Sequence, residues 1–351
     1  MMRITLFAGL VGAAGLAMAT TALAQQPSEL SVMSFGGAYQ AAQRKAFFEP
    51  YTAKTGVHFA EQEYGGEIAK IKAMVDTGGG NLDVVDVDGP GAQQGCDEGL
   101  YERLDWSKIG NRSDWLPGTA TACAVGTIVY GTVLAYDPAK FKEGGPTKLA
   151  DLFDTKRFPG KRGLWKSPVS NLEFALIADG VSSKDVYKVL ATKAGVDRAF
   201  KKLDTIKKDV VWWEAGAQAP QLLVSGDVVM TTAWNGRIFN ANKEGQHFKI
   251  VWDNVLLDSD SWVIPKGAKH PDASYAFIRF TVQPDVLSTM PKYIPYGPVT
   301  HAAAAAVPPQ YAANLPTSPQ NNAETAFATD YSFWGDKGEE LRRRFTNWLA
   351  Q

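Results

Sequence analysis

The chain has 351 residues and a formal net charge of −1 at pH 7. This near-neutral balance argues against nucleic-acid binding, which requires a basic face, so we expect no nucleic-acid partner. The length is sufficient for one large hydrophobic core or two moderate ones.

The first 24 residues have the pattern of a cleaved secretory signal. Arg3 gives a positive start, an apolar run follows, and Ala22-Leu23-Ala24 is a small-x-small cleavage site. The alternative is an N-terminal membrane anchor, but the apolar run is short and rich in glycine and alanine. We therefore predict a signal peptide over residues 1–24 and a mature protein that is free in the periplasm.

Two cysteines, Cys96 and Cys123, occur in this exported chain. An even count in an oxidising compartment favours one disulfide, which stabilises by roughly 2–4 kcal/mol; two buried thiols are the alternative. The four histidines lie far apart and have no ligand spacing with the cysteines, so we expect neither a metal site nor a cofactor.

The N-terminal part of the mature chain alternates between strand and helix patterns. Residues 29–35, 57–64 and 82–88 are predicted strands, and amphipathic helices are predicted over residues 39–54 and in the segment that ends at Gly78-Gly79-Gly80. This β-α-β-α-β order predicts a doubly wound parallel sheet.

The middle of the chain begins with a long β-rich run over residues 126–137, which we expect to cross between two bodies. A second α/β unit follows over residues 136–255, and one of its helices begins where Ser170 and Glu173 have capping-box spacing. Residues 228–234 are a predicted strand that ends at an aromatic ring, and Gly236 in the Asn-Gly pair behind it marks a tight turn.

The C-terminal part is predicted to contain a strand and a helix within residues 261–286, separated by a Pro/Gly turn. The Ala302–Ala306 run predicts a short helix. The tail is an amphipathic helix in which Leu341, Phe345 and Leu349 recur every four residues.

Catalytic motifs are not found. The sequence has no G-x-S-x-G, H-E-x-x-H or G-x-G-x-x-G pattern and no P-loop, so we expect no enzyme activity. An exported chain with two α/β bodies favours a solute binder that closes around its ligand. A secreted hydrolase with an unrecognised site is the alternative.

Four sequence blocks carry a family resemblance, namely "FDTKRFPGKRGL", "SGDVVMTTAWNGR", "WVIPKGAKHPDASYAFIRFTVQPDV" and "YIPYGPVT". They resemble the periplasmic spermidine/putrescine-binding proteins of ABC transporters and the related γ-aminobutyrate-type binders. The resemblance implies a type II periplasmic-binding fold with two lobes, a hinge and a ligand cleft between the lobes. It also implies capture of a small aliphatic amine, partner permease subunits at the inner membrane, and a monomer.

Lobe boundaries follow from this resemblance and from the order of predicted elements. We expect residues 25–135 plus 262–305 to form lobe 1, and residues 136–261 plus 306–351 to form lobe 2. A periplasmic metal carrier of the same fold is a further alternative. Iron binders of this fold use neighbouring tyrosines, and no Tyr-Tyr pair occurs in the sequence.

The family's ligand-binding positions fall on several residues of this chain. Trp234 matches a tryptophan that stacks on the ligand, Asp260 matches a carboxylate that binds an amine, and Tyr296 matches a tyrosine at the cleft edge. Further candidates at matching positions, each with core packing or capping as its alternative, are Phe35, Tyr39, Asp88, Trp213 and Trp334. Asp86 shares one side of a strand with Asp88, and either carboxylate could bind an ammonium or cap the next segment; Asp88 is favoured.

Arg237 departs from the family pattern, because the polyamine binders usually have a small residue after Asn-Gly. A guanidinium in the cleft repels a diamine and suits a carboxylate. With Asp260 it would bind the two ends of a zwitterion such as an ω-amino acid. Arg237 could instead turn outward or pair with Asp260, so the sequence leaves the choice between a polyamine and an amino acid open.

Overall fold

The computed structural model describes Met1 and residues 27–78, 82–142, 144–321 and 324–351. Apart from Met1, the predicted signal peptide lies outside the described residues and stays a prediction. Within these ranges, none of the helices combines the length and the hydropathy that are needed to span a bilayer.

The N-terminal strands form a parallel unit. β1 (Glu29–Ser34) lies between β2 (His58–Glu63) and β3 (Val84–Asp88) and is parallel to both. The predicted helix between β1 and β2 is formed by α1 (Gly37–Gln43), the π-helical turn η1 (Arg44–Phe48) and α2 (Glu49–Thr55). The connection between β2 and β3 contains α3 (Ile68–Asp76). The predicted β-α-β-α-β order is therefore confirmed.

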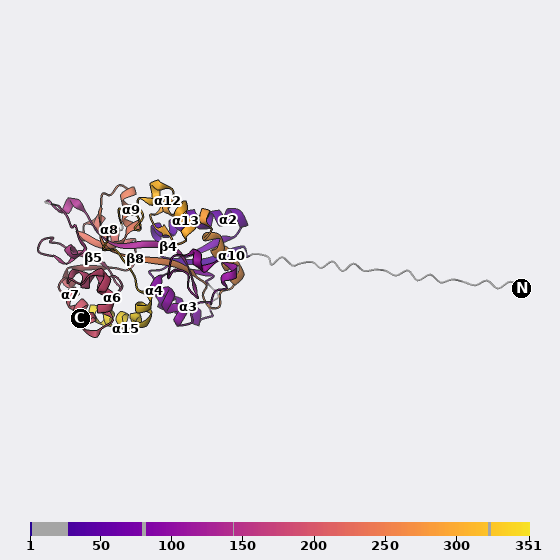
Figure 1. Cartoon of the computed structure of the whole chain (residues 1–351), viewed down its shortest axis with the longest axis horizontal. Helices are drawn as coiled ribbons and strands as arrows, with labels where there is room; N and C mark the ends of the chain where they lie inside the picture. The colour runs from indigo at the N-terminus through magenta and orange to yellow at the C-terminus, as the bar shows by residue number, and fades with distance from the viewer. Residues whose placement is uncertain (2–26, 79–81, 143, 322–323) are drawn as a thin grey trace.

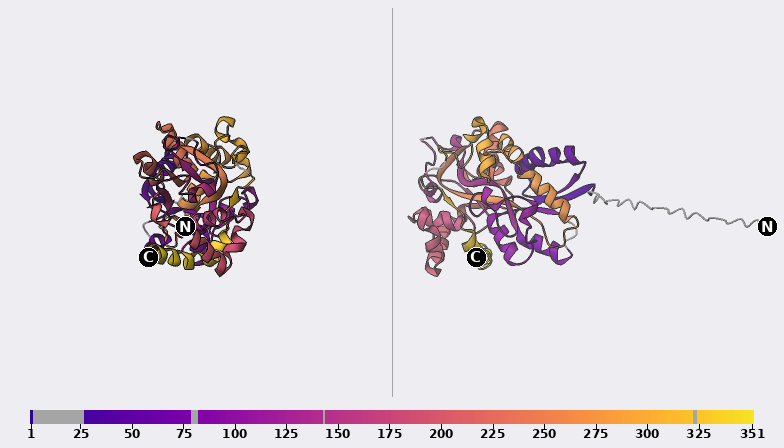
Figure 2. Two further views of the ribbon diagram at one scale, coloured as in Figure 1. Left: turned by 90° about the vertical axis from the view of Figure 1, so that its left-hand side faces the viewer. Right: turned by 45° about the vertical axis from the view of Figure 1, so that its right-hand side comes forward.

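Two long strands join this unit to the rest of the molecule. β8 (Lys249–Val263) is antiparallel to β3 and to β4 (Ala124–Tyr136), and β4 is buried along nearly its whole length. The sheet as a whole is therefore mixed, because β8 runs antiparallel to β3 and β4, whereas the three N-terminal strands are parallel as predicted. Figures 1 and 2 show both strands passing through the centre of the molecule, with helices around them.

The second half of the sheet continues from β4. The strand order is β2-β1-β3-β8-β4-β7-β5-β6, with β9 beside β4 and β10 beside β8. These further strands are β5 (Arg162–Trp165), β6 (Val210–Trp213), β7 (Met230–Trp234), β9 (Gly297–Pro298) and β10 (Phe327–Ala328). The predicted strand over residues 228–234 and the predicted long run over residues 126–137 are both confirmed.

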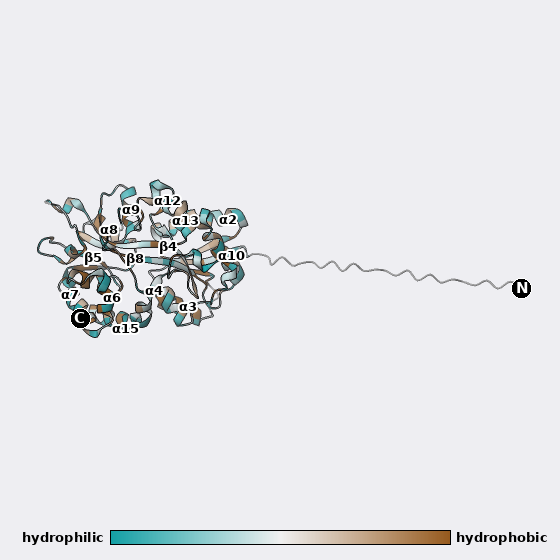
Figure 3. Cartoon of the chain, in the orientation of Figure 1, coloured by the Kyte–Doolittle hydropathy of each residue, from teal (hydrophilic) through white to brown (hydrophobic). Residues whose placement is uncertain are grey.

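Helices cover the sheet, and Figure 3 shows hydrophilic residues on their outer sides. The remaining α-helices are α4 (Gly89–Asp97), α5 (Asn171–Ala178), α6 (Val186–Leu190), α7 (Lys193–Asp204), α8 (Gln218–Ser225), α9 (Asn235–Lys243), α10 (Pro271–Thr281), α11 (Pro284–Leu287), α12 (Met290–Tyr293), α13 (His301–Ala306), α14 (Pro309–Ala312) and α15 (Tyr331–Leu349). Short 3-10 turns are η2 (Trp106–Lys108), η3 (Arg112–Asp114), η4 (Pro138–Lys140), η5 (Leu149–Phe153), η6 (Ser183–Asp185) and η7 (Lys207–Asp209).

The C-terminal helix and the disulfide tie separate segments together. α15 contacts α4, while its Phe345 and Trp348 pack against Trp212 of β6 and Phe200 of α7. Cys96 at the end of α4 forms a disulfide with Cys123, which directly precedes β4. The predicted disulfide is therefore confirmed.

Two local predictions hold only in part. α5 begins directly after Ser170 as predicted, but the Ser170 side chain makes no capping hydrogen bond, and its backbone φ of 66° is outside the extended range of a usual N-cap residue. Gly236 forms no turn and lies in the first turn of α9. A glycine is needed there for close approach, because a Cβ would lie 2.6 Å from Cε1 of Tyr296.

Candidate ligand-binding site

A small buried cavity brings together most of the residues that the sequence singles out. Six of the lining residues were predicted as ligand contacts and one was not; together they are Phe35, Tyr39, Tyr130, Trp234, Arg237, Asp260 and Tyr296. The lining is therefore largely aromatic, with one acidic and one basic side chain.

The stretch Trp234-Asn235-Gly236-Arg237 forms one wall of the cavity. Trp234 ends β7, and α9 begins at the next residue. The Asn235 side chain accepts from the backbone N–H of Gly131 at 2.9 Å and donates to the carbonyl of Pro295 at 2.9 Å. These bonds fix the start of α9 against β4 and against the loop that carries Tyr296. Trp234 and Arg237 therefore line the cavity, and Asn235 holds the start of α9 in place.

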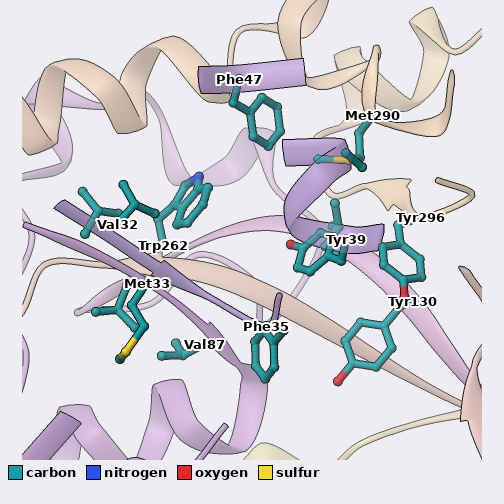
Figure 4. Packing of buried hydrophobic residues seen from close by; sticks show 14 of the residues in the cluster. Val32, Met33, Phe35, Tyr39, Phe47, Val87, Tyr130, Trp262, Met290 and Tyr296 are labelled. Atoms are coloured by element: carbon teal, nitrogen blue, oxygen red, sulfur yellow. The ribbon is translucent and has the colours of Figure 1, made fainter. Parts of the chain in front are cut away.

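Aromatic rings enclose the cavity from several elements. The rings of Tyr39 and Tyr296 are 5.3 Å apart, and those of Tyr130 and Tyr296 are 5.8 Å apart. Figure 4 shows these three tyrosines around one space, with Phe35 nearby. Trp234 meets Phe35 edge-on at 5.9 Å. Such walls pack against methylene groups and attract an ammonium through their ring faces.

Arg237 points inward and is 2% exposed. Its Nη1 donates to the carbonyl of Gly36 at 2.9 Å, and its Nη2 donates to that of Phe35 at 3.2 Å. Its Nε has no hydrogen-bond partner among the described residues. Because a guanidinium has five N–H donors and is always charged, Arg237 retains donors for a ligand anion.

Asp260 supplies the opposite charge from β8 and is 4% exposed. No lysine, arginine or histidine of the described ranges forms an ion pair with it, and its Oδ1 has no hydrogen-bond partner there. Burial raises the pKa of Asp260 well above its ordinary value; the nearby carboxylates of Asp86 and Asp88 raise it further, and Arg237 lowers it. A ligand ammonium would supply the missing partner.

Three predicted site residues lie outside the cavity lining. Asp88 caps α4 by accepting from the Gly91 N–H at 2.7 Å, which was its alternative role. Trp213 is buried behind Trp234, with ring centroids 5.5 Å apart. Trp334 lies in a different hydrophobic cluster, where its Nε1 donates to Glu173 at 2.8 Å.

Two residues of the site region were not among the ligand contacts predicted from the sequence. Tyr130 lines the cavity from the middle of β4, where its place in a uniformly β-rich run gives no sign of the face on which it lies. Asp86 does not line the cavity; the sequence indicated it together with Asp88 as a carboxylate that could bind an ammonium, and Asp88 was favoured. The contacts of Asp86 depend on residues of β1 and α1 that are far away in sequence.

The chemistry of the cavity is that of binding. An unpaired carboxylate, a partly free guanidinium and five aromatic rings surround one small space. In the part of the chain that the structure describes, no group of three or more histidine, cysteine, aspartate or glutamate side chains is placed to hold a metal ion. This arrangement is typical of a protein that binds a small molecule.

Comparison with known proteins identifies the family. Residues 46–317 match the model of the bacterial extracellular solute-binding proteins. The chain is 48% identical over 337 residues to the γ-aminobutyric acid-binding protein of Pseudomonas aeruginosa, which covers 96% of this chain and 95% of that protein. A more distant relative is the spermidine/putrescine-binding periplasmic protein of Escherichia coli, at 23% identity over 279 residues, 75% of this chain and 76% of that protein.

Solved structures agree with this result. The periplasmic binding protein MotA from A. tumefaciens B6, in complex with glucopine, has a TM-score of 0.87 and 29% identity over 92% of this chain and 99% of that chain. The GABA receptor Atu4243 has a TM-score of 0.79 and 34% identity over 92% of this chain and 98% of that chain. The chain has the two-lobe fold of periplasmic binding proteins, and it belongs to the bacterial extracellular solute-binding protein family.

Proposed function

We propose that the protein captures a small zwitterionic ω-amino acid, such as γ-aminobutyrate, for import by an ABC transporter. The main observation in support is that one small cavity contains a buried carboxylate and a buried guanidinium, each with an atom that lacks a hydrogen-bond partner among the described residues. The ammonium of the ligand would pair with Asp260 and its carboxylate with Arg237, while the aromatic rings pack against the methylene chain. The 48% identity to a γ-aminobutyric acid-binding protein supports the same assignment.

A periplasmic location and permease partners are part of this proposal. The N-terminal pattern around Arg3 and Ala22-Leu23-Ala24 favours export and cleavage of residues 1–24, and the family is extracellular. The solute-binding relatives support binding without chemistry as part of this proposal. The two lobes proposed from the sequence, residues 25–135 plus 262–305 and residues 136–261 plus 306–351, would close over the ligand as the chain crosses between them in β4 and β8.

A diamine is the second candidate ligand. The observation that favours it is the number of buried carboxylates near the cavity, since Asp86, Asp88 and Asp258 accompany Asp260. Against it, a second ammonium would lie beside the guanidinium of Arg237 and be repelled.

Calorimetry of the purified mature protein tests these assignments. Titration with γ-aminobutyrate, putrescine, spermidine and ferric ion should give heat of binding with γ-aminobutyrate and little or none with the others. Binding of putrescine or spermidine without binding of γ-aminobutyrate would overturn the zwitterion proposal. Turnover of an ester or peptide substrate without any of these binding events would favour the hydrolase instead.

A further inference from the structure

Three buried polar atoms without hydrogen-bond partners meet at the acidic side of the cavity. They are the Tyr39 hydroxyl, Asp86 Oδ1 and Asp260 Oδ1, and none of them completes a hydrogen bond of acceptable geometry with another described residue. Tyr39 and Asp260 line the cavity, whereas Asp86 lies behind them. Buried polar atoms are rarely left unpaired. The Tyr39 hydroxyl and Asp86 are close enough to interact with each other, which leaves Asp260 Oδ1 as the atom that points to an absent partner.

The position of Asp86 is fixed by its other carboxylate oxygen. Asp86 Oδ2 accepts from Ser34 Oγ at 3.0 Å and from Gln43 Nε2 at 2.8 Å. Asp86 Oδ1 receives neither of these bonds and is left to interact with the Tyr39 hydroxyl. Burial raises the pKa of this hydroxyl well above its ordinary value, and the charges of Asp86 and then Asp260 raise it further. The tyrosine hydroxyl therefore lies under the influence of both carboxylates.

The sheet register places these carboxylates on one face. Asp88 pairs directly with Asp260 in the antiparallel ladder between β3 and β8, and Asp86 is two residues away along β3. Asp86 and Asp260 are therefore diagonal neighbours, a relation in which Cα atoms are about 7–8 Å apart. The Tyr39 hydroxyl, from α1, reaches the region between them.

Two carboxylates this close in a dry environment do not both ionise without a cation. Burial raises the pKa of Asp86 to about 7, against the opposing effects of Ser34, Gln43 and Tyr39. Ion pairs to Asp86 or Asp260 are absent from the described residues, so no protein cation neutralises the pair directly. The other titratable or charged groups that face this region are Tyr64, Asp88, Tyr130, Arg237, Asp258 and Tyr296.

We propose that Asp86 is a positioning residue for the ammonium end of the ligand, and that this ammonium displaces a proton which Asp86, Tyr39 and Asp260 share in the ligand-free protein. The ammonium retains its own three protons and pairs with Asp260 and the tyrosine oxygen. The shared proton passes to the solvent, so one positive charge enters as another leaves. This inference rests on the proposed function, because it requires an amine ligand.

The test is calorimetry with γ-aminobutyrate near pH 7 in buffers of different ionisation enthalpy, such as phosphate and Tris. The slope of the observed enthalpy against the ionisation enthalpy of the buffer counts the protons released. For the unmodified protein we expect roughly 0.5–1 proton released per ligand, because a group with a pKa of about 7 is half protonated there. Asp86→Asn should reduce this number to less than half of that and weaken binding.

The matched control is Glu173→Gln. Burial also raises the pKa of Glu173 to about 7, but Glu173 lies in a hydrophobic cluster with Trp334 and does not line the cavity. This variant should release as many protons as the unmodified protein. Tyr39→Phe is a second variant, which keeps the ring and removes the hydroxyl, and it should release fewer protons.

The outcomes separate this inference from the proposed function. Binding of γ-aminobutyrate with an enthalpy that does not change between buffers would overturn the shared proton and leave the proposed function intact. Proton release that is unchanged in both Asp86→Asn and Tyr39→Phe would overturn the role of Asp86. No binding of γ-aminobutyrate or of either polyamine would overturn both proposals together.

Discussion

On the acidic side of the cavity, Asp86 and Asp260 are held by the paired strands β3 and β8, whereas on its basic side Arg237 extends from the first turn of α9. The carboxylates are fixed by a sheet ladder. The guanidinium is fixed by side-chain contacts, namely the Asn235 bonds that hold α9 and its own bonds to two backbone carbonyls. The position of Arg237 therefore depends on a few side-chain contacts, whereas the positions of Asp86 and Asp260 depend on backbone pairing in the sheet.

The largest effect is expected from Asp260→Asn. This change removes the one carboxylate that lines the cavity among the residues that the structure describes, while keeping the shape of the side chain. Loss of one partner from a buried charge pair costs about 2–5 kcal/mol, so the Kd for γ-aminobutyrate should rise roughly 30-fold to several thousand-fold. Calorimetry measures the change. Asp258→Asn, on the same strand but outside the cavity lining, is the control, and an equal loss in both variants would contradict a direct contact.

A smaller effect with a change of preference is expected from Arg237→Ser. Removal of the guanidinium takes away the partner of the ligand carboxylate, which is worth about 1.5–3 kcal/mol, and also the repulsion of a second ammonium. Binding of γ-aminobutyrate should therefore weaken roughly 10-fold to 150-fold, while putrescine should bind better than it does to the unmodified protein.

Arg342→Ser is the matched control for this change, because Arg342 is another largely desolvated arginine but lies outside the cavity lining. It should leave both affinities unchanged. If Arg237→Ser weakened γ-aminobutyrate and putrescine equally, the guanidinium would act through the structure and not through the ligand carboxylate.

Gly236→Ala tests how the basic side is positioned. Its Cβ would lie 2.5 Å from Cγ1 of Ile294 and 2.6 Å from Cε1 of Tyr296, so α9 or the tyrosine must move. Overpacking of this kind costs about 1–3 kcal/mol, and we expect a lower thermal midpoint together with weaker binding. Gly110→Ala, whose Cβ meets Trp115 at an ordinary 3.6 Å, should change neither quantity. A normal affinity in Gly236→Ala would show that Arg237 does not need this packing.

The smallest effect on binding is expected from Glu173→Gln, which changes a buried carboxyl outside the cavity. Burial raises the pKa of Glu173 from 4.5 to about 7, so the folded protein keeps a proton there that the unfolded chain releases. The stability from this group is present at low pH and is lost as the pH rises from about 4.5 to 7. Denaturant unfolding should show this loss, of roughly 1–3 kcal/mol, in the unmodified protein but not in the variant.

Much of the site was predictable from the sequence, and the stretch around Trp234 shows why. A run of β-forming residues that ends at an aromatic ring indicates the end of a strand, where ligands bind in α/β sheets, and the cavity lies there. The orientation of Arg237 was not predictable, because it depends on the carbonyls of Phe35 and Gly36, about 200 residues away in sequence.

Trp334 is a second residue whose surroundings depend on a partner far away in the sequence. It was predicted as a ligand contact, but it lies in a hydrophobic cluster because its indole N–H donates to Glu173, a residue 161 positions earlier. Similarly, the sequence predicted a parallel sheet because β1, β2 and β3 have that pattern. The antiparallel course of β4 and β8 arises from pairing between segments that are more than 110 residues apart. Local patterns carry no information about such partners.

The course of β4 has a consequence for the spacing of two cavity residues. Asp260 pairs with Ile128 on one edge of β4, and Trp234 pairs with Thr132 on its other edge. Their partners on β4 are thus four residues apart, about 13 Å along the strand. Backbone hydrogen bonds set this offset, so a substitution at Asp260 or Trp234 changes the chemistry of the cavity without changing the offset between the two backbone positions.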